Sequence, residues 1–191
     1  KKNNAKIFQA STSEVYGDPL IHPQDESYRG NVNIIGVRAC YDEGKRLAES
    51  IFFDYYRTHK INIKIARIFN TYGPNMNNDD GRVVSNFILS ALKGNPLIIH
   101  GNGKQTRSFI HVDDVCRALI KGARSGLKFE IFNLGNKTSV SINKLAREFS
   151  DDIVYLPKKK GDINHSKCKT TKVEKSLNFL PQIKLKDGIK N

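Results

Sequence analysis

The sequence predicts an α/β fold in which helices pack on a mainly parallel sheet, and three observations point to it. Short apolar, β-branched runs alternate along the chain with longer stretches whose apolar residues recur at helical spacing. Glycine, proline and asparagine separate these segments. The 191 residues are 38% hydrophobic and include 10 phenylalanines and 7 tyrosines, which is enough apolar material for a core. We therefore expect one folded domain with an appendage rather than a disordered chain.

The first part of the chain predicts two strands around one long helix. Residues 6–10 predict a strand that ends at the polar run 11–13. From residue 41 to about residue 59, apolar side chains recur on one face and predict a long helix. Alternating isoleucines predict a second strand over residues 61–69, which the run Asn70–Pro74 ends.

The second part of the chain continues the alternation. Its predicted elements are a helix, a strand, a helix, a strand and a helix, over residues 84–91, 97–99, 112–123, 129–134 and 142–149. Asp113 and Asp114 lie at the start of the second of these helices, where negative charge is favourable. Ser141 can cap the last helix. This order of elements is typical of a layered α/β fold with a parallel sheet.

The positive charge of the chain is concentrated at its C-terminal end. The formal net charge is +13, and residues 157–191 contribute +7 of it through ten lysines and three acidic residues. This segment contains no nucleic-acid-binding motif and a single aromatic residue, Phe179. We therefore predict that most of these lysines form a solvated surface and that nucleic acid is not a partner.

The composition also argues against several other classes of protein. No apolar stretch approaches the roughly 18 residues of a membrane span, and the start of the sequence lacks a secretory signal. We therefore expect a soluble, cytoplasmic protein, although an upstream Golgi anchor stays open. The three cysteines have no Cys-x-x-Cys spacing and the five histidines have no metal-ligand spacing, so we predict no metal. The first residue is not methionine, which suggests a fragment.

Tyr41 and Lys45 are the first candidates for chemistry, because their spacing puts a phenol and an ammonium one helical turn apart on one face. A tyrosine acts as a base at pH 7 only if its pKa falls by about three pH units from about 10, which a neighbouring positive charge favours. The phenolate could then take a proton from an alcohol held by Thr12 or Ser13, which follow a predicted strand. The alternative is a tyrosine packed in the core beside a surface lysine.

Longer runs surround these residues. They are Ala-Ser-Thr-Ser-Glu-Val-Tyr-Gly-Asp-Pro (10–19), Gly-Asn-Val-Asn (30–33), Arg-Ala-Cys-Tyr-Asp-Glu-Gly-Lys-Arg (38–46), Ala-Arg-Ile-Phe-Asn-Thr-Tyr-Gly-Pro (66–74), Asp-Gly-Arg-Val-Val-Ser-Asn-Phe (80–87) and Gly-Asn-Gly-Lys-Gln-Thr-Arg-Ser-Phe (101–109). Together they resemble the extended short-chain dehydrogenase/reductase family, which contains the NAD-dependent epimerases and dehydratases. Within it, residues 5–136 are most similar to the UDP-glucuronate decarboxylases.

This resemblance implies a fold and a domain organisation. The fold would be the C-terminal part of a Rossmann-like doubly wound parallel sheet, with a small α/β region that binds substrate. Residues 1–75 would form the second half of the NAD-binding domain, and residues 76–191 mainly the nucleotide-sugar region with returning Rossmann elements. No Gly-x-Gly-x-x-Gly occurs in the chain, so its NAD-pyrophosphate loop would lie in an absent N-terminal half. We expect the fragment alone to bind NAD poorly and to be inactive.

The resemblance also implies roles for individual residues. Tyr41 would act as base and acid on the sugar C4 oxygen with Lys45 tuning it, Thr12 or Ser13 would bind that oxygen, and Glu14 would face the sugar. The implied NAD-binding residues are Ser11, Tyr41, Lys45, Ile68 and Thr71. The implied residues for the UDP part are Asn70, Val84, Ser85, Asn86, Phe87, Ile88, Gly101, Gln105 and Arg107. The planar fork of Arg107 suits the diphosphate.

The activity that the resemblance implies is conversion of UDP-glucuronate to UDP-xylose and CO₂ through a 4-keto sugar, with recycled NAD. Residues 161–169 look more like the 4-epimerases of the family, and no arginine follows Arg147. A UDP-sugar 4-epimerase is therefore the main rival. The 4,6-dehydratases resemble Thr-Asp-Glu at the positions where this chain has Thr12, Ser13 and Glu14. Because Ser13 replaces the aspartate, a 4,6-dehydratase is disfavoured. A non-catalytic nucleotide-sugar-binding module is the alternative of another class. We also expect a homodimer through the helix at Tyr41–His59.

Overall fold

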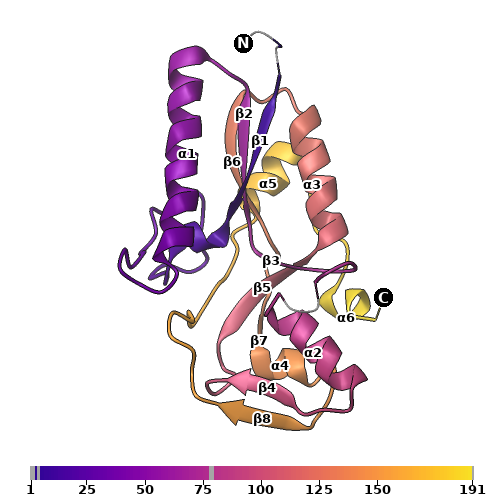
Figure 1. The fold of residues 1–191 in the computed structure, drawn as a ribbon. Coiled ribbons are helices and arrows are strands. Elements are labelled where there is room, and N and C mark those ends of the chain that lie inside the picture. The colour runs from indigo at the N-terminus through magenta and orange to yellow at the C-terminus, as the bar shows by residue number, and fades with distance from the viewer. Residues whose placement is uncertain (1–2, 4, 78–79, 191) are drawn as a thin grey trace.

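The computed structural model describes residues 3, 5–77 and 80–190, and it confirms an α/β fold with parallel sheets (Figure 1). The first sheet contains β1 (Ile7–Thr12), β2 (Ile63–Ile68) and β6 (Phe129–Leu134). Their order is β1-β2-β6 and both pairings are parallel, with Ala10 opposite Ala66 and Ala66 opposite Phe132. The carboxyl ends of all three strands therefore lie at the same edge of the sheet.

Helices cover both faces of this sheet. α1 (Ala39–His59) lies along one face, and α3 (Val112–Arg124) and α5 (Thr171–Leu177) lie along the other (Figure 1). The core between the sheet and α3 and α5 consists of Ala66, Ile110, Val115, Ala118, Phe132, Leu134, Val173, Leu177 and Phe179. Burial of these side chains supplies the main driving force for docking the two helices.

A smaller α/β region lies beyond the carboxyl edge of the first sheet (Figure 1). It contains β3 (Asn70–Tyr72), β5 (Thr106–His111) and β7 (Ser139–Ser141) in the order β3-β5-β7, and a parallel pair, β4 (Leu97–His100) with β8 (Ile153–Leu156). Its helices are α2 (Val83–Leu92), α4 (Ile142–Ala146) and α6 (Leu185–Gly188). A second core joins them, with Phe87, Leu97, Ile99 and Leu145 almost fully buried. The domain division after residue 75 stays a prediction.

The C-terminal segment is part of the core as well as a charged surface. Its lysines are mostly exposed, as predicted, but Ser166, Cys168 and Thr170 alternate with them and are buried. Further along, the Asp114 carboxylate accepts backbone hydrogen bonds from Gln182 and Ile183, both at 3.0 Å. Asp114 therefore anchors the C-terminal segment to α3, a role that its place at the helix start did not predict.

None of the helices in the described part of the chain combines the length and hydropathy that a membrane crossing requires. The cytoplasmic location stays a prediction.

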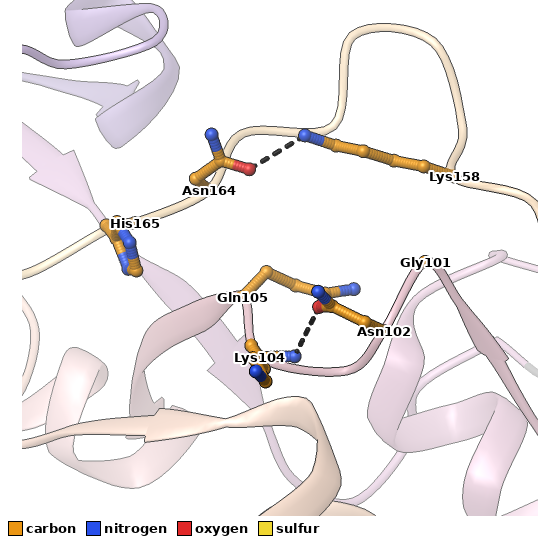
Figure 2. A pocket seen from close by; sticks show the side chains of 7 residues that line it. All are labelled: Gly101, Asn102, Lys104, Gln105, Lys158, Asn164 and His165. Carbon is orange, nitrogen blue, oxygen red and sulfur yellow. Dashed lines mark hydrogen bonds between the residues drawn. The ribbon is translucent and has the colours of Figure 1, made fainter.

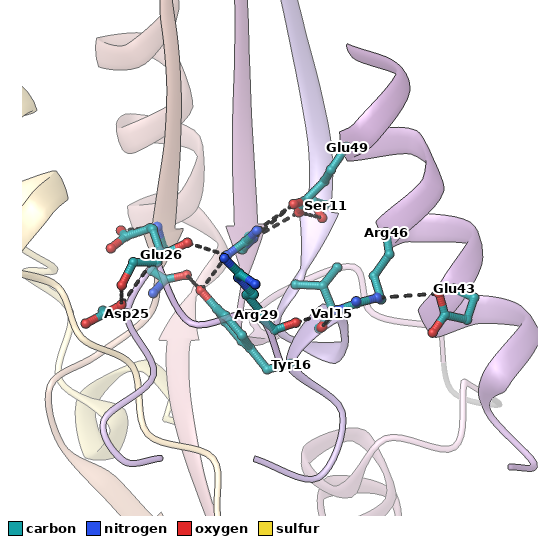
Figure 3. Close-up of polar contacts among 12 residues, drawn as sticks. Ser11, Val15, Tyr16, Asp25, Glu26, Arg29, Glu43, Arg46 and Glu49 are labelled. Carbon is teal, nitrogen blue, oxygen red and sulfur yellow. Dashed lines mark hydrogen bonds and ion pairs between the residues drawn. The ribbon is translucent and has the colours of Figure 1, made fainter. Parts of the chain in front are cut away.

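A buried ion pair fastens α1 to the first sheet. The carboxylate of Glu49 on α1 accepts hydrogen bonds from Nε (3.0 Å) and Nη2 (2.6 Å) of Arg67 on β2, and both side chains are about 10% exposed. The hydroxyl of Ser11 donates to the same carboxylate at 2.5 Å (Figure 3). Residues 41, 45 and 49 recur every four positions, so this pair orients the helix face that carries Tyr41 and Lys45.

Tyr16 extends this polar network below the sheet (Figure 3). Its hydroxyl accepts from Arg67 at 3.0 Å and donates to Asn133 on β6 at 2.7 Å. Burial raises the pKa of Tyr16, and the nearby charge of Arg67 offsets this only in part. Burial alone would lower the pKa of Arg67, but its bonds to Glu49 and Tyr16 outweigh burial and raise it. The network therefore keeps Arg67 charged and Tyr16 neutral.

Replacing Glu49 by glutamine tests this ion pair. Glu49→Gln leaves the buried Arg67 charge without its counter-charge, which destabilises proteins by about 3–5 kcal/mol. The same change at Glu43, whose pair with Arg46 at 3.4 Å is well exposed, should cost less than about 1 kcal/mol. Equilibrium urea unfolding of the two variants measures the difference. Equal, small losses in both would show that the pair does not stabilise the fold.

Candidate active site

A cleft of about 1090 Å³ lies where the carboxyl edge of the first sheet meets the smaller α/β region. Its walls come from the ends of β1 and β2, the start of α1, β3, the start of α2, β4, β5 and the segment of residues 159–163. Ligands of open parallel sheets bind at this edge, beyond the carboxyl ends of the strands. The position of the cleft therefore makes it the candidate site.

Tyr41 and Lys45 both line this cleft. Tyr41 is 48% exposed, so its phenol is not packed in the apolar core. The Lys45 ammonium lies 5.8 Å from the centre of the Tyr41 ring and donates a hydrogen bond to the carbonyl of Ala10 at 3.0 Å. This bond ties the lysine to the end of β1 while keeping its positive charge beside the phenol.

The residues that follow β1 form a short 3-10 turn, η1 (Ser13–Tyr16), at the same end of the cleft. The Thr12 hydroxyl accepts the backbone N–H of Glu14 at 3.3 Å and caps this turn, which leaves its O–H free to donate to a ligand. Gly17 ends the turn at φ +62°, and a side chain there would collide with the backbone of Asn31. Thr12, Ser13 and Glu14 are thereby presented to the cleft beside Tyr41.

Most of the other predicted site residues line the same cleft. These are Ser11, Ile68, Asn70, Thr71, Val84, Asn86, Phe87, Gln105 and Arg107. Ser11 also uses its hydroxyl in the buried bond to Glu49 described above. Ser85 and Ile88 are not among the lining residues, and the Ser85 hydroxyl instead bonds to Asp80 at 2.7 Å. Ser85 therefore holds the loop before α2 rather than facing the cleft.

Gly101 lines a smaller neighbouring pocket of about 290 Å³ (Figure 2). Gln105 contributes to both cavities, and its amide donates to the carbonyl of His100 at 2.7 Å. Lys158 Nζ donates to Asn164 Oδ1 at 2.7 Å, and Figure 2 shows this pair across the pocket from Lys104. The pocket therefore adjoins the main cleft at Gln105.

Arg107 lies on the wall opposite Tyr41, and its guanidinium is 11% exposed and paired with Asp162. Burial lowers the pKa of Arg107, and the charge of Asp162 counteracts this only in part. Asp162 belongs to the segment of residues 159–163, where Gly161 has φ +78° and lies against Val37 at the start of α1. This segment lines the cleft, and no local sequence pattern marks its contact with Arg107.

Arg38 is a second cationic residue that the sequence reasoning missed. It lines the cleft one turn before Tyr41, and its Nε donates to the Glu14 carboxylate at 2.9 Å. Arg38 precedes the helix predicted from residue 41, so its place three residues before Tyr41 was the available signal, because residues three apart share a face if the helix begins earlier.

Asp42 lies buried beside this pair, and its Oδ1 has no hydrogen-bond partner among the described residues. Burial, followed by the nearby charge of Glu14, raises the pKa of Asp42 to about 6. Near neutral pH a fraction of Asp42 is therefore uncharged, which limits the negative charge around Glu14.

Among residues 3, 5–77 and 80–190, no cluster of three histidine, cysteine or acidic side chains could hold a metal ion. The described polar residues of the cleft are hydroxyls, amides and ion pairs, which suit proton transfer and the binding of an anionic ligand.

Comparison with known proteins adds independent evidence. UDP-glucuronic acid decarboxylase 5 of Arabidopsis thaliana is 50% identical over 195 aligned residues, which cover 99% of this chain and 57% of that protein. The chain thus spans little more than half the length of this curated relative.

Solved structures share the fold. UDP-glucose 4-epimerase from Thermotoga maritima, solved with UDP-glucose, superimposes with a TM-score of 0.89 at 27% identity, covering 97% of this chain and 61% of that one. UDP-glucuronic acid 4-epimerase from Bacillus cereus, solved with UDP-glucuronic acid and NAD, gives a TM-score of 0.87 at 26% identity, with 97% and 59% coverage.

A family model also matches directly. Residues 1–135 match the NAD dependent epimerase/dehydratase family, which confirms the resemblance inferred from the sequence. The chain therefore belongs to the NAD-dependent epimerase/dehydratase family.

Proposed function

We propose that the protein to which this chain belongs is a UDP-glucuronate decarboxylase that forms UDP-xylose and CO₂. The observation that carries the proposal is the arrangement of Tyr41, Lys45 and Thr12 around one cleft, in a chain half identical to a UDP-glucuronic acid decarboxylase. An exposed phenol beside an ammonium and a free hydroxyl donor suits proton transfer at a sugar alcohol.

The described residues fit one end of NAD. Ser11, Ile68 and Thr71 line the cleft at the ends of β1 and β2, next to Tyr41 and Lys45, where parallel sheets bind dinucleotides. We propose that these residues hold the nicotinamide end, with Lys45 at its ribose. NAD, when bound, supplies an acceptor for the hydrogen on the sugar C4 and later returns it.

The proton chemistry then belongs to this chain. Tyr41 takes the proton of the C4 hydroxyl and returns it to the same oxygen at the end of the cycle, while Thr12 or Ser13 holds that oxygen by a hydrogen bond. Oxidation at C4 leaves the C5 carboxylate β to a ketone, so CO₂ can leave as electrons move into the carbonyl. A proton then takes its place at C5, and Glu14, which lines the cleft next to Thr12 and Ser13, would orient its donor.

The opposite wall of the cleft would hold the UDP part. Arg107 is the candidate for the diphosphate, because its guanidinium is largely desolvated and lies in the half of the cleft formed by β5. Asn70, Val84, Asn86, Phe87 and Gln105 complete this wall. In this proposal the diphosphate shares Arg107 with Asp162 or displaces it.

A 4-epimerase remains the second candidate, because Asp162 and its neighbours in residues 161–169 resemble that branch and 4-epimerases superimpose closely on this chain. An epimerase uses the same Tyr41 chemistry but keeps the carboxylate. The two activities therefore differ in their products rather than in the first proton transfer.

Product analysis separates the candidates. The full-length protein, supplied with NAD and UDP-glucuronate labelled in its carboxyl group, should release labelled CO₂ and form UDP-xylose in equal amounts. Formation of UDP-galacturonate with the label retained would identify a 4-epimerase instead. Binding of UDP-glucuronate without any turnover would identify a non-catalytic module.

Tyr41→Phe in the full-length protein removes the proton acceptor and leaves the ring in place. The turnover number should fall by about 10²–10⁴-fold, which is the usual effect of a positioned acid/base group. Tyr155→Phe is the matched control, since Tyr155 is exposed on β8 outside the cleft and should keep wild-type turnover. Wild-type turnover in Tyr41→Phe would contradict the assignment.

We further propose a homodimer through α1. Leu47, Ile51 and Tyr55 recur every four residues on this helix and are 61%, 48% and 51% exposed, so they form one apolar stripe. Phe53 and Tyr56 instead contact Phe129 within the chain. A second copy of the same helix is the occupant that matches such a self-complementary stripe.

Sedimentation measurements test this interface. Ile51→Glu in the full-length protein should convert dimers to monomers at micromolar concentration, because it buries a charge against an apolar partner. Ile120→Glu, on the exposed side of α3, should leave the dimer intact. A monomeric wild-type protein, or dissociation by both variants, would contradict the proposal.

A further inference from the structure

The cleft contains several cations, and they lie at different places relative to Tyr41. They are Arg38, Lys45, Arg82, Arg107, Lys159 and Lys160. Three of them besides Arg38 have a partner within the chain. Lys45 is bonded to the carbonyl of Ala10, Arg82 pairs with Asp80 before α2, and Arg107 pairs with Asp162.

Arg38 is a cation close to Tyr41 along the chain, on the side opposite to Lys45. It stands immediately before α1, and the backbone N–H of Tyr41 donates to its carbonyl at 3.0 Å, so the two residues are joined in one turn. Residues three apart on a helix have neighbouring side chains, about 5–6 Å apart at Cβ. Arg38 and Tyr41 also both line the cleft, so one bound ligand could contact both side chains.

Glu14 holds the guanidinium of Arg38 but does not saturate it. Nε and Nη2 both contact the same Glu14 oxygen, at 2.9 and 2.8 Å. Within the described part of the chain, no hydrogen bond is made by Nη1, and the side chain is 48% exposed. The outer edge of the guanidinium, Nη1 with the second hydrogen of Nη2, remains oriented for a planar anion in the cleft.

We propose that Arg38 binds the carboxylate on C5 of the substrate sugar and thereby selects uronate sugars over neutral ones. The inference rests on the proposed function, since it requires a UDP-uronate in the cleft. In UDP-glucuronate the carboxylate is on the carbon next to C4, so a sugar held at C4 by Tyr41 would carry its carboxylate close to that residue, and Arg38 lines the same cleft one turn earlier in the chain. Glu14 fixes the guanidinium in the cleft and offsets part of its charge.

Because Glu14 offsets part of the Arg38 charge, Arg38 suits a reaction in which the substrate carboxylate is lost as CO₂. An isolated, buried arginine would stabilise the carboxylate in the ground state and oppose its loss as neutral CO₂. Arg38 is half exposed and already paired with Glu14, so its attraction for a second carboxylate is moderate. It should therefore contribute to substrate binding more than to turnover.

The test compares UDP-glucuronate with UDP-glucose, which lacks the carboxylate, by calorimetry on the full-length, NAD-loaded protein carrying Tyr41→Phe, in which turnover is slow enough for binding to be measured. Arg38→Gln should weaken UDP-glucuronate binding by about 10–100-fold, the usual effect of losing hydrogen bonds to a charged group, and change UDP-glucose binding by less than about threefold. Arg38→Lys should give an intermediate loss. Arg124→Gln, which removes one exposed charge outside the cleft, should leave the binding of both ligands unchanged.

Steady-state kinetics add a second readout. In Arg38→Gln, KM for UDP-glucuronate should rise and kcat should stay within about fivefold, as expected when binding common to ground and transition states is lost. The proposal would be overturned if Arg38→Gln weakened the binding of both ligands equally, or if it lowered kcat and left KM unchanged.

A Glu14→Gln background separates direct binding from indirect effects. If Arg38 acts only by masking the Glu14 charge, the selectivity effect of Arg38→Gln should vanish in that background, and the proposal fails. If Arg38 contacts the carboxylate, the effect persists. Failure of the proposed function is recognised separately, because wild-type protein would then release no CO₂ from UDP-glucuronate whatever the Arg38 variants show.

Discussion

The ion pair between Glu49 on α1 and Arg67 on β2 is the interaction on which the geometry of the cleft depends. It joins the helix face that carries Tyr41 and Lys45 to the central strand of the first sheet, with Ser11 and Tyr16 completing its hydrogen bonds. A buried pair of this kind gains little net stability over an apolar contact. Its hydrogen bonds are directional, however, so they fix the orientation of α1 about the helix axis. In this orientation Tyr41 and Lys45 face the ends of β1 and β2.

Much of the fold could be predicted because its information is local. The long helix and the strands of the first sheet are marked by uninterrupted apolar patterns, and the predicted bounds differ from the observed ones by a few residues. β5 was missed because its start, Thr106 to Ser108, is polar. β3 and β7 were missed because a strand of three residues is too short to show an alternation of apolar and polar side chains. In the C-terminal segment, abundant lysines concealed the buried Val173, Leu177 and Phe179.

In the candidate site, too, local sequence patterns predicted some residues, whereas contacts between distant parts of the chain could not be predicted. Tyr41 and Lys45 could be paired from spacing alone, Thr12 and Ser13 could be proposed from their place after a predicted strand, and the family resemblance supplied Glu14. The partner of Arg107 could not be found, because Asp162 is 55 residues away and reaches it through tertiary folding. Ser85 and Ile88 were grouped with their neighbours as one run, although a helix turns only some of its residues toward any surface.

The docking of the C-terminal segment has a consequence for how the molecule can be shortened. The same stretch that brings Asp162 to Arg107 continues into Phe179 in the core and into Gln182 and Ile183 on the Asp114 carboxylate. Deleting it would leave a cavity beside α3 and would also remove the segment that lines the cleft at Arg107. A series of C-terminal deletions would therefore change ligand affinity and the stability of the fold at the same time. Point substitutions are needed to measure the two effects separately.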